Sequence, residues 1–159
     1  PVIANGDIDS VQKARSVLTL TGAAGVMIGR AAQGQLWLPG AIASALMAGD
    51  EHARTPAPTE QLRLQGDHLL RLHDFHGAHM GPRIARKHQA WLLESLTAQR
   101  VISAEDARAR RQAFNRLESA EAQVECLGEM TDALMSASPA TASTIQMSSQ
   151  LWPQMSEAA

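Results

Sequence analysis

Strand-like and helix-like segments alternate only within the first 49 residues, and this alternation most constrains the fold. A short apolar run covers residues 2–5, and a second one covers residues 26–28. Apolar residues at helical spacing follow each run, over 11–18 and again over 31–48. Short continuous apolar runs are typical of strands buried on both faces. The order strand, helix, strand, helix predicts a parallel βαβα unit with a right-handed crossover.

Capping residues define the helices of this unit. Ser10 precedes the first apolar helical position, and Gly22 follows the last one. Serine is a favoured N-cap and glycine a favoured C-cap, so the first helix is expected between them. The second helix is expected to be interrupted around Pro39 and Gly40, because proline and glycine disfavour a helix interior.

The pattern changes after residue 49, which divides the chain into an α/β part and an all-α part. Residues 50–58 contain two prolines and are interpreted as a linker. Helices are predicted over 59–76, over 83–99, and from a capping box at Ser103 to about residue 130. They would form a small bundle with Phe75, Trp91 and Phe114 among the inward-facing side chains. Residues 131–159, rich in Ser, Thr and Ala, are expected to form a disordered tail.

The composition restricts the kinds of site and partner. The only cysteine, Cys126, excludes an internal disulfide and a zinc site built from cysteines, and it is interpreted as a small core residue. His73, His76 and His79 recur every three residues, but no set of acidic ligands completes a metal site. No apolar run approaches the roughly 20 residues of a membrane helix. We therefore expect no metal, no membrane and a cytoplasmic location.

Polar residues follow both predicted strands. Asn5, Gly6 and Asp7 end the first strand, and Gly29 and Arg30 end the second. Ligands of parallel α/β folds bind at the carboxyl ends of the strands, and a helix N-terminus with a nearby cation favours an anion. These five residues are therefore a candidate phosphate clamp. Ordinary turn chemistry is the alternative interpretation of the same residues.

Residues 60–116 are locally basic, with ten basic and six acidic side chains. Within them Arg83, Arg86 and Lys87 are spaced at i, i+3 and i+4, so they are expected on one side of a helix. Cations one helical turn apart suit the phosphates of an RNA. The alternative is a solvated charged face.

Three separated stretches resemble the tRNA-dihydrouridine synthases, and among them the bacterial B-type enzymes. They are PVIANGDI, KARSVLTLTGAAGVMIGRAAQGQLW, and HDFHG followed by RIARKHQAWLL, within residues 1–130. The resemblance implies that residues 1–49 are the last two βα units of a truncated FMN-binding TIM barrel, and that residues 59–130 are a helical tRNA-binding domain. It also implies that Asn5, Gly6, Asp7, Gly29 and Arg30 lie in the FMN-phosphate region.

The family's activity is the reduction of uridine in tRNA to 5,6-dihydrouridine, with FMN as cofactor and NADPH as reductant. The resemblance implies tRNA as the partner of Arg83, Arg86 and Lys87, and a monomeric full-length enzyme. The family's catalytic cysteine segment has no match here, so no catalytic residue is assigned and the isolated chain is expected to be inactive. A non-catalytic tRNA-binding module and an inactive remnant of such an enzyme are the alternatives.

Overall fold

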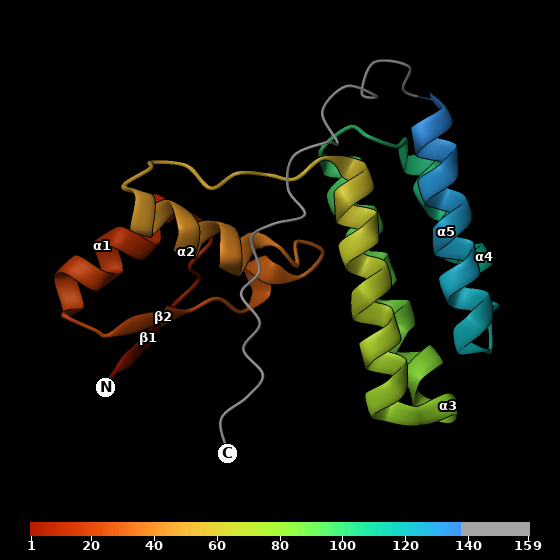
Figure 1. The fold of residues 1–159 in the computed structure, drawn as a ribbon, viewed down its shortest axis with the longest axis horizontal. Helices are drawn as coiled ribbons and strands as arrows, with labels where there is room; N and C mark the ends of the chain where they lie inside the picture. Colours follow the sequence, from red (N-terminus) through yellow and green to blue (C-terminus); the bar gives the residue numbers. More distant parts are fainter. Residues whose placement is uncertain (138–159) are drawn as a thin grey trace, which may run out of the picture.

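The computed structural model describes residues 1–137, which form two groups of elements (Figure 1). The first group contains β1 (Ile3–Asn5), α1 (Val11–Thr21), β2 (Gly25–Met27), a 3-10 turn η1 (Arg30–Ala32) and α2 (Leu38–Ala48). The second contains α3 (Pro58–Ala98), α4 (Ala104–Asn115) and α5 (Ala120–Ala137). The helices of the second group lie side by side as a bundle. None of the described helices is long and apolar enough to cross a membrane.

The first group confirms the parallel βαβα order. β1 and β2 pair in parallel, with Ala4 opposite Val26, and α1 connects them. The predicted caps of α1 are also confirmed. The Ser10 hydroxyl accepts a hydrogen bond from the backbone N–H of Lys13, and Gly22 adopts the left-handed conformation with φ of 64°. This conformation is costly for residues with a Cβ atom, which explains a glycine at that position.

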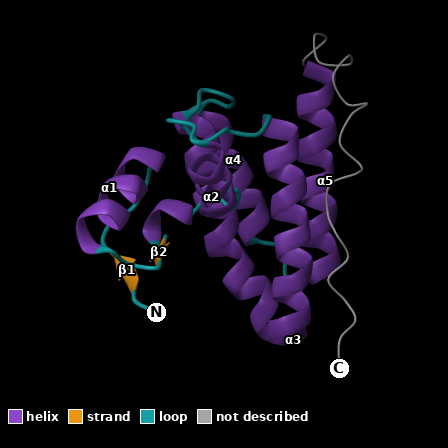
Figure 2. Ribbon diagram, turned by 60° about the vertical axis from the view of Figure 1, so that its left-hand side comes forward, coloured by secondary structure: helices purple, strands orange, loops and turns teal. Residues whose placement is uncertain are grey.

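The strands are not buried on both faces as their apolar sequence predicts. Ile3 is 57% exposed and Met27 is 45% exposed. Within residues 1–137 the sheet has two strands, and its apolar core lies toward α1 and α2 (Figure 2). The buried members of that core are Ile8, Val11, Ala14, Leu38, Ile42 and Ala45. The sequence identified the strands correctly, but their second face has no cover among the described residues.

The interruption in the second helical segment lies earlier than predicted. The chain forms η1 and then a turn, and α2 begins at Leu38. Pro39 and Gly40 lie inside the first turn of α2 and do not break it. Proline is tolerated in the first turn because the N–H groups there have no helical partner. The turn before α2 contains Gly34, whose φ is 73°.

Helix α3 consists of two antiparallel limbs, 58–76 and 78–98, divided at Gly77, whose φ of 73° and ψ of 174° are not helical. Hydrogen bonds connect the limbs, from Gln61 to Gln99 at 2.8 Å and between His68 and His88 at 3.0 Å. Two helices were predicted here, but the second begins at 78, before the predicted start at 83. A Cβ atom on Gly81 would lie 2.9 Å from the Cα of His73, so glycine allows the limbs to approach closely.

The predicted third helix is two helices, α4 and α5, with a turn at 116–119. The N-cap of the predicted capping box is confirmed, because the Ser103 hydroxyl accepts from the Asp106 N–H at 3.0 Å; the Asp106 carboxylate accepts from that hydroxyl, at 2.7 Å, and not from the Ser103 N–H as a full capping box requires. The break has a local cause, since the Ser119 hydroxyl caps α5 by accepting from the Ala122 N–H at 3.1 Å. α5 continues to Ala137, so the predicted start of the tail at 131 is wrong. The rest of that segment, 138–159, lies outside the described residues.

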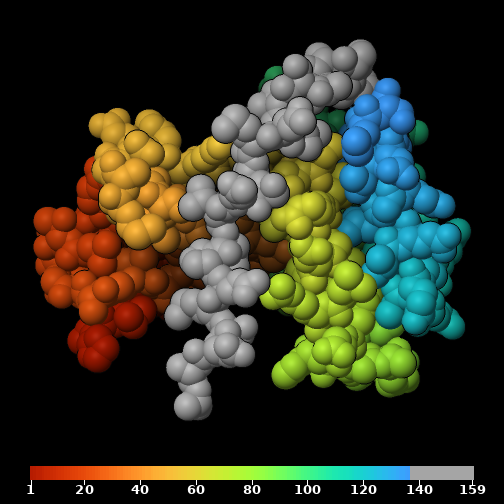
Figure 3. Space-filling view, in the orientation of Figure 1, coloured from red at the N-terminus to blue at the C-terminus, as the bar shows by residue number. Residues whose placement is uncertain are grey.

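The bundle has its own apolar core between α3, α4 and α5. Phe114 is 1% exposed at its centre, as predicted. Phe75 is 83% exposed, so its inward assignment is wrong, because Leu72 and His73 occupy the buried positions at that end of the first limb. Figure 3 shows the first limb of α3 and α5 packed side by side, in agreement with the contacts between these helices.

Candidate functional site

A pocket of about 440 Å³ lies at the carboxyl ends of β1 and β2. Its lining residues are Asn5, Gly6, Asp7, Ile8, Met27, Gly29, Arg30 and Ala31. All five residues of the candidate phosphate clamp are among them. Parallel pairing explains this arrangement, because the polar segments that follow two neighbouring strands leave the sheet at the same edge.

An ion pair joins the two sides of this pocket, from the Arg30 guanidinium to the Asp7 carboxylate. Both side chains are largely exposed, at 79% and 66%. Exposed ion pairs contribute about 0–1 kcal/mol, so little free energy is needed to release Arg30 to another anion. Asp7 also has a positive φ of 48°, and the preceding Gly6 contributes no side chain to the pocket. Arg30 is therefore available to a phosphate that enters between the two loops.

Two residues that line the same pocket, Arg30 and Ala31, open the 3-10 turn η1. The first hydrogen bond of η1 runs from the Ala32 N–H to the Gly29 carbonyl at 3.0 Å. The N–H groups of Arg30 and Ala31 precede this bond and have no partner within the turn. Such N–H groups beside a guanidinium bind phosphate oxygens well. The donor set thus fits a phosphate group, and the apolar Met27 and Ile8 border it.

The three predicted RNA-contacting cations do not share one exposed face. Arg83 and Lys87 are exposed on the second limb of α3. The Lys87 ammonium lies 4.6 Å from the centre of the Trp91 ring, a cation–π contact. Arg86 is half-buried, and its guanidinium donates to the Leu117 carbonyl at 3.2 Å. The prediction that Arg86 faces outward is therefore wrong, because it connects α3 to the turn between α4 and α5.

A buried polar cluster in the bundle was missed by the sequence analysis. Gln123 of α5 is 0% exposed, and its Oε1 atom lies 2.9 Å from Nε2 of His73. Its Nε2 group donates to the Pro82 carbonyl at 3.0 Å. One side chain thus contacts both limbs of α3. No pattern of residue types marks Gln123, because its partners are 41 and 50 positions away.

The three histidines His73, His76 and His79 lie apart, unlike the ligands of a metal site. His73 is buried beside Gln123, whereas His76 and His79 are exposed. Within residues 1–137 no three His, Cys, Asp or Glu side chains gather as metal ligands would. Cys126 packs against the bundle core, and burial, together with nearby Glu129, raises the pKa of its thiol.

His68 and His88 form a half-buried pair between the two limbs of α3, with Nε2 of His68 3.0 Å from Nδ1 of His88. Burial lowers the pKa of both imidazoles, and for His88 the neighbouring His68, Lys87 and His76 lower it further. Protonation of both rings would also remove the hydrogen bond between them, because one ring nitrogen must accept it. The folded chain therefore favours the pair in its neutral form.

This pair predicts a pH dependence of stability. The folded pKa values lie below the unfolded value of about 6.5, so the unfolded chain binds more protons as the pH falls. The contribution of the pair to the free energy of unfolding is fully present above about pH 6.5 and is lost as the pH falls below that value. We expect the urea midpoint to decrease between pH 7.5 and pH 5.5, and less so in the His68→Gln/His88→Gln variant. His52→Gln, at an exposed position, is the matched control. An equal decrease in the double variant would contradict the prediction.

Comparisons with known proteins agree on one family. The family model described as Dihydrouridine synthase (Dus) matches residues 1–134. The chain is 44% identical over 127 residues to tRNA-dihydrouridine synthase B of Vibrio cholerae, covering 80% of this chain and 37% of the relative. It is 46% identical to the enzyme of that name in Pseudomonas aeruginosa and 48% to that of Pseudomonas syringae, each over 123 residues, 77% of this chain and 34% of the relative. The matched part thus spans about a third of these curated relatives.

Proposed function

The chain belongs to the dihydrouridine synthase family, and we propose that it supplies two parts of an FMN-dependent tRNA-dihydrouridine synthase. In this proposal residues 1–49 are the last two βα units of a TIM barrel and hold the phosphate of FMN. The helical bundle that begins at Pro58 holds tRNA. The observation that carries the proposal is the pocket at the ends of β1 and β2, whose donors suit a phosphate.

FMN, with NADPH as the reductant, supplies the hydride that converts a uridine of tRNA to 5,6-dihydrouridine. The residues of this chain have a binding role toward the cofactor. Arg30 neutralises the phosphate, while the N–H groups of Arg30 and Ala31 donate to its oxygens. Asn5, Gly6, Asp7 and Gly29 line the space around it. In the absence of the phosphate, Asp7 keeps Arg30 oriented at the pocket.

The bundle contributes cations to tRNA binding. Arg83 and Lys87 are exposed and one helical turn apart, so both cations can contact the phosphates of one RNA. Arg86 acts indirectly, because its bond to the Leu117 carbonyl holds the turn between α4 and α5. The proposed setting is a monomeric enzyme of the cytoplasm.

Catalysis requires groups beyond those that residues 1–137 contribute to the pocket. Among the described residues, the one carboxyl that lines the pocket is that of Asp7, which pairs with Arg30, and Cys126 packs against the core of the bundle instead. We therefore propose that the isolated chain binds its ligands without turnover. The separate core of the bundle also suits the second candidate, a tRNA-binding module without catalysis. FMN binding distinguishes the two candidates, because the module has no need of it.

The phosphate pocket is tested by comparing FMN with riboflavin, which lacks the phosphate. Titration calorimetry on the chain is expected to detect FMN binding and much weaker riboflavin binding. Replacing Arg30 with alanine should weaken FMN binding about 10- to 100-fold, the value of a charge-assisted hydrogen bond of about 1.5–3 kcal/mol. Arg15→Ala is the matched control, since Arg15 is exposed on α1 and donates to the Asp50 carbonyl at 2.9 Å. Equal affinity for FMN and riboflavin would reject the assignment.

A further inference from the structure

Gly34, in the turn between η1 and α2, packs directly against the backbone of α3. It is buried, and a Cβ atom at this position would lie 2.2 Å from the carbonyl oxygen of Trp91 and 2.6 Å from its carbonyl carbon. Ordinary contacts between non-bonded heavy atoms require about 3.5 Å or more. The φ of 73° also favours glycine. Gly34 is therefore fixed by the space available and by the backbone conformation.

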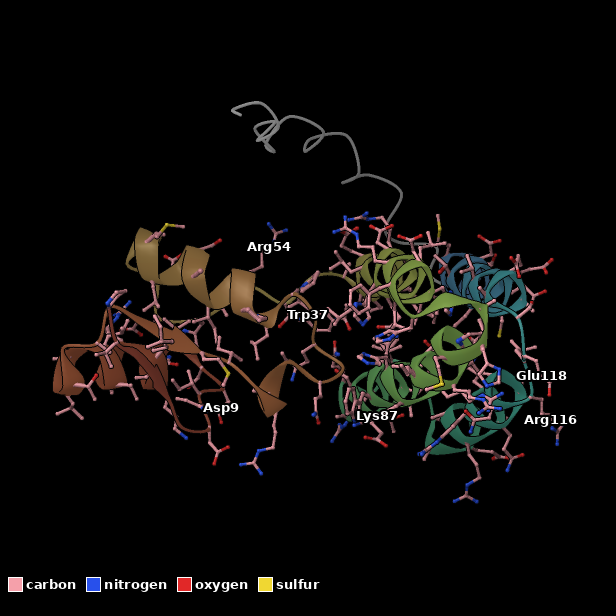
Figure 4. The ribbon with its side chains drawn as sticks, turned by 90° about the horizontal axis from the view of Figure 1, so that it is seen from below. Asp9, Trp37, Arg54, Lys87, Arg116 and Glu118 are labelled. Carbon is pink, nitrogen blue, oxygen red and sulfur yellow. The ribbon has the colours of Figure 1, made fainter. Side chains whose placement is uncertain are left out.

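A continuous series of turns connects Gly34 to the phosphate pocket. The Gln33 N–H donates to the Arg30 carbonyl and the Gln35 N–H to the Ala32 carbonyl, both at 3.0 Å. The Leu38 N–H then donates to the Gln35 carbonyl at 2.9 Å, where α2 begins with a buried leucine. Figure 4 shows Trp37 of this segment between the first group of elements and the bundle. A displacement of Gly34 would therefore also displace the wall of the pocket.

The other side of the contact lies next to the proposed RNA-binding residues. Trp91 is one helical turn after Lys87, whose ammonium lies 4.6 Å from the Trp91 ring centre. The His88 ring lies 5.1 Å from the same ring and also contacts His68 of the first limb. The backbone that Gly34 touches is therefore tied to both limbs of α3 and to an exposed cation.

We propose that Gly34 is a positioning residue, whose contact with the Trp91 backbone sets the distance between the phosphate pocket and the cations Arg83 and Lys87. The inference rests on the proposed function, because that distance matters only if the two sites hold the cofactor and the tRNA. A target uridine must reach the flavin held at the pocket while the same tRNA is held by the bundle. Misplacement of reacting groups by about 1 Å can cost a factor of 100 in rate.

The geometry is tested first on the chain itself, without any ligand. Spin labels at Ser44→Cys on α2 and Ala113→Cys on α4, both exposed, in a Cys126→Ala background report the distance between the two groups of elements. The parent should give a narrow distribution. Gly34→Ala must open the contact by about 1.3 Å to restore an ordinary separation, so its distribution should shift or broaden. Gly22→Ala, with a φ of 64° and no atom within 4 Å of the added Cβ, is the matched control.

The functional consequence is tested after joining residues 1–134 to the preceding part of the Vibrio cholerae relative. In Gly34→Ala, the reduction of bound flavin by NADPH should keep its rate, because it needs only the barrel. The reoxidation of the flavin by tRNA should slow about 10- to 100-fold. A variant with one glycine inserted after Gly34 loosens the same contact without a clash. It should also keep the rate of flavin reduction and slow the reoxidation, even if Gly34→Ala folds poorly.

The outcomes separate the two proposals. A broad distance distribution in the parent, or one left unchanged by Gly34→Ala and by the insertion, overturns the positioning role. Equal slowing of flavin reduction and reoxidation also overturns it, since a general structural defect would do the same. A fusion that forms no dihydrouridine contradicts the proposed function, and the distance measurement then still decides whether Gly34 fixes the two groups of elements.

Discussion

Replacing Gln123 with alanine is expected to destabilise the bundle by about 2–4 kcal/mol. Its side chain is 0% exposed, and it pairs with His73 at 2.9 Å and with the Pro82 carbonyl at 3.0 Å. Leaving a buried polar group without its partner costs about 1–3 kcal/mol. Alanine would leave two such groups unpaired, one on each limb of α3, and would also create a cavity between α3 and α5.

Urea unfolding followed by circular dichroism measures this loss as a lower midpoint at unchanged slope. Gln112→Ala is the matched control, because Gln112 is exposed on α4 and surface substitutions change stability by about 0.5 kcal/mol or less. Equal midpoints for the two variants would show that the hydrogen bonds of Gln123 contribute nothing net. The stabilising role of the contacts from Gln123 to both limbs of α3 would then be rejected.

The candidate phosphate clamp was predictable from sequence because local order determines it. Asn5 is the last residue of β1 and Gly29 lies two residues after β2, and parallel pairing brings the ends of two neighbouring strands to the same edge. The caps at Ser10 and Ser103 are equally local, since each hydroxyl accepts from an N–H three residues on. These features, each set within one helical turn or one βα unit, could therefore be predicted, although the equally local cap of α5 at Ser119 was not recognised.

The bundle was less predictable because long-range contacts decide which side chains it buries. Arg86 was assigned outward from its spacing with Arg83 and Lys87. The Arg86 guanidinium instead donates to the Leu117 carbonyl, 31 positions away. That carbonyl lies in the turn after α4, which ends at Asn115. The contact between Gly34 and Trp91 likewise joins residues from different groups of elements, and no periodicity in the sequence indicates it.

Removing Arg83 and Lys87, two exposed cations on the second limb of α3, is expected to weaken tRNA binding strongly. Arg83 and Lys87 are exposed, and the Lys87 ammonium lies over the Trp91 ring. Each phosphate contact contributes about 0.7–0.9 to the slope of log affinity against log salt concentration. The Arg83→Ala/Lys87→Ala variant should therefore lose about 1.4–1.8 from this slope, and about 10- to 50-fold in affinity at 0.15 M salt.

The control variant removes a single exposed arginine from the other limb of α3. Arg63 of the first limb already pairs with Glu60 at 2.7 Å and with Asp67 at 2.8 Å. The Arg63→Ala variant removes an exposed arginine whose charge is locally neutralised, so its tRNA affinity should change little. Thermal unfolding of all variants should confirm that the bundle remains folded.

Titration of the purified chain with tRNA over a range of salt concentrations tests the central claim most directly. The bundle is predicted to bind tRNA with an affinity that falls steeply as salt increases, and the Arg83→Ala/Lys87→Ala variant should show the reduced slope while Arg63→Ala retains the parent slope. Binding that is absent in the parent, or a slope identical in the parent and the double variant, would contradict the claim that this face of α3 holds tRNA.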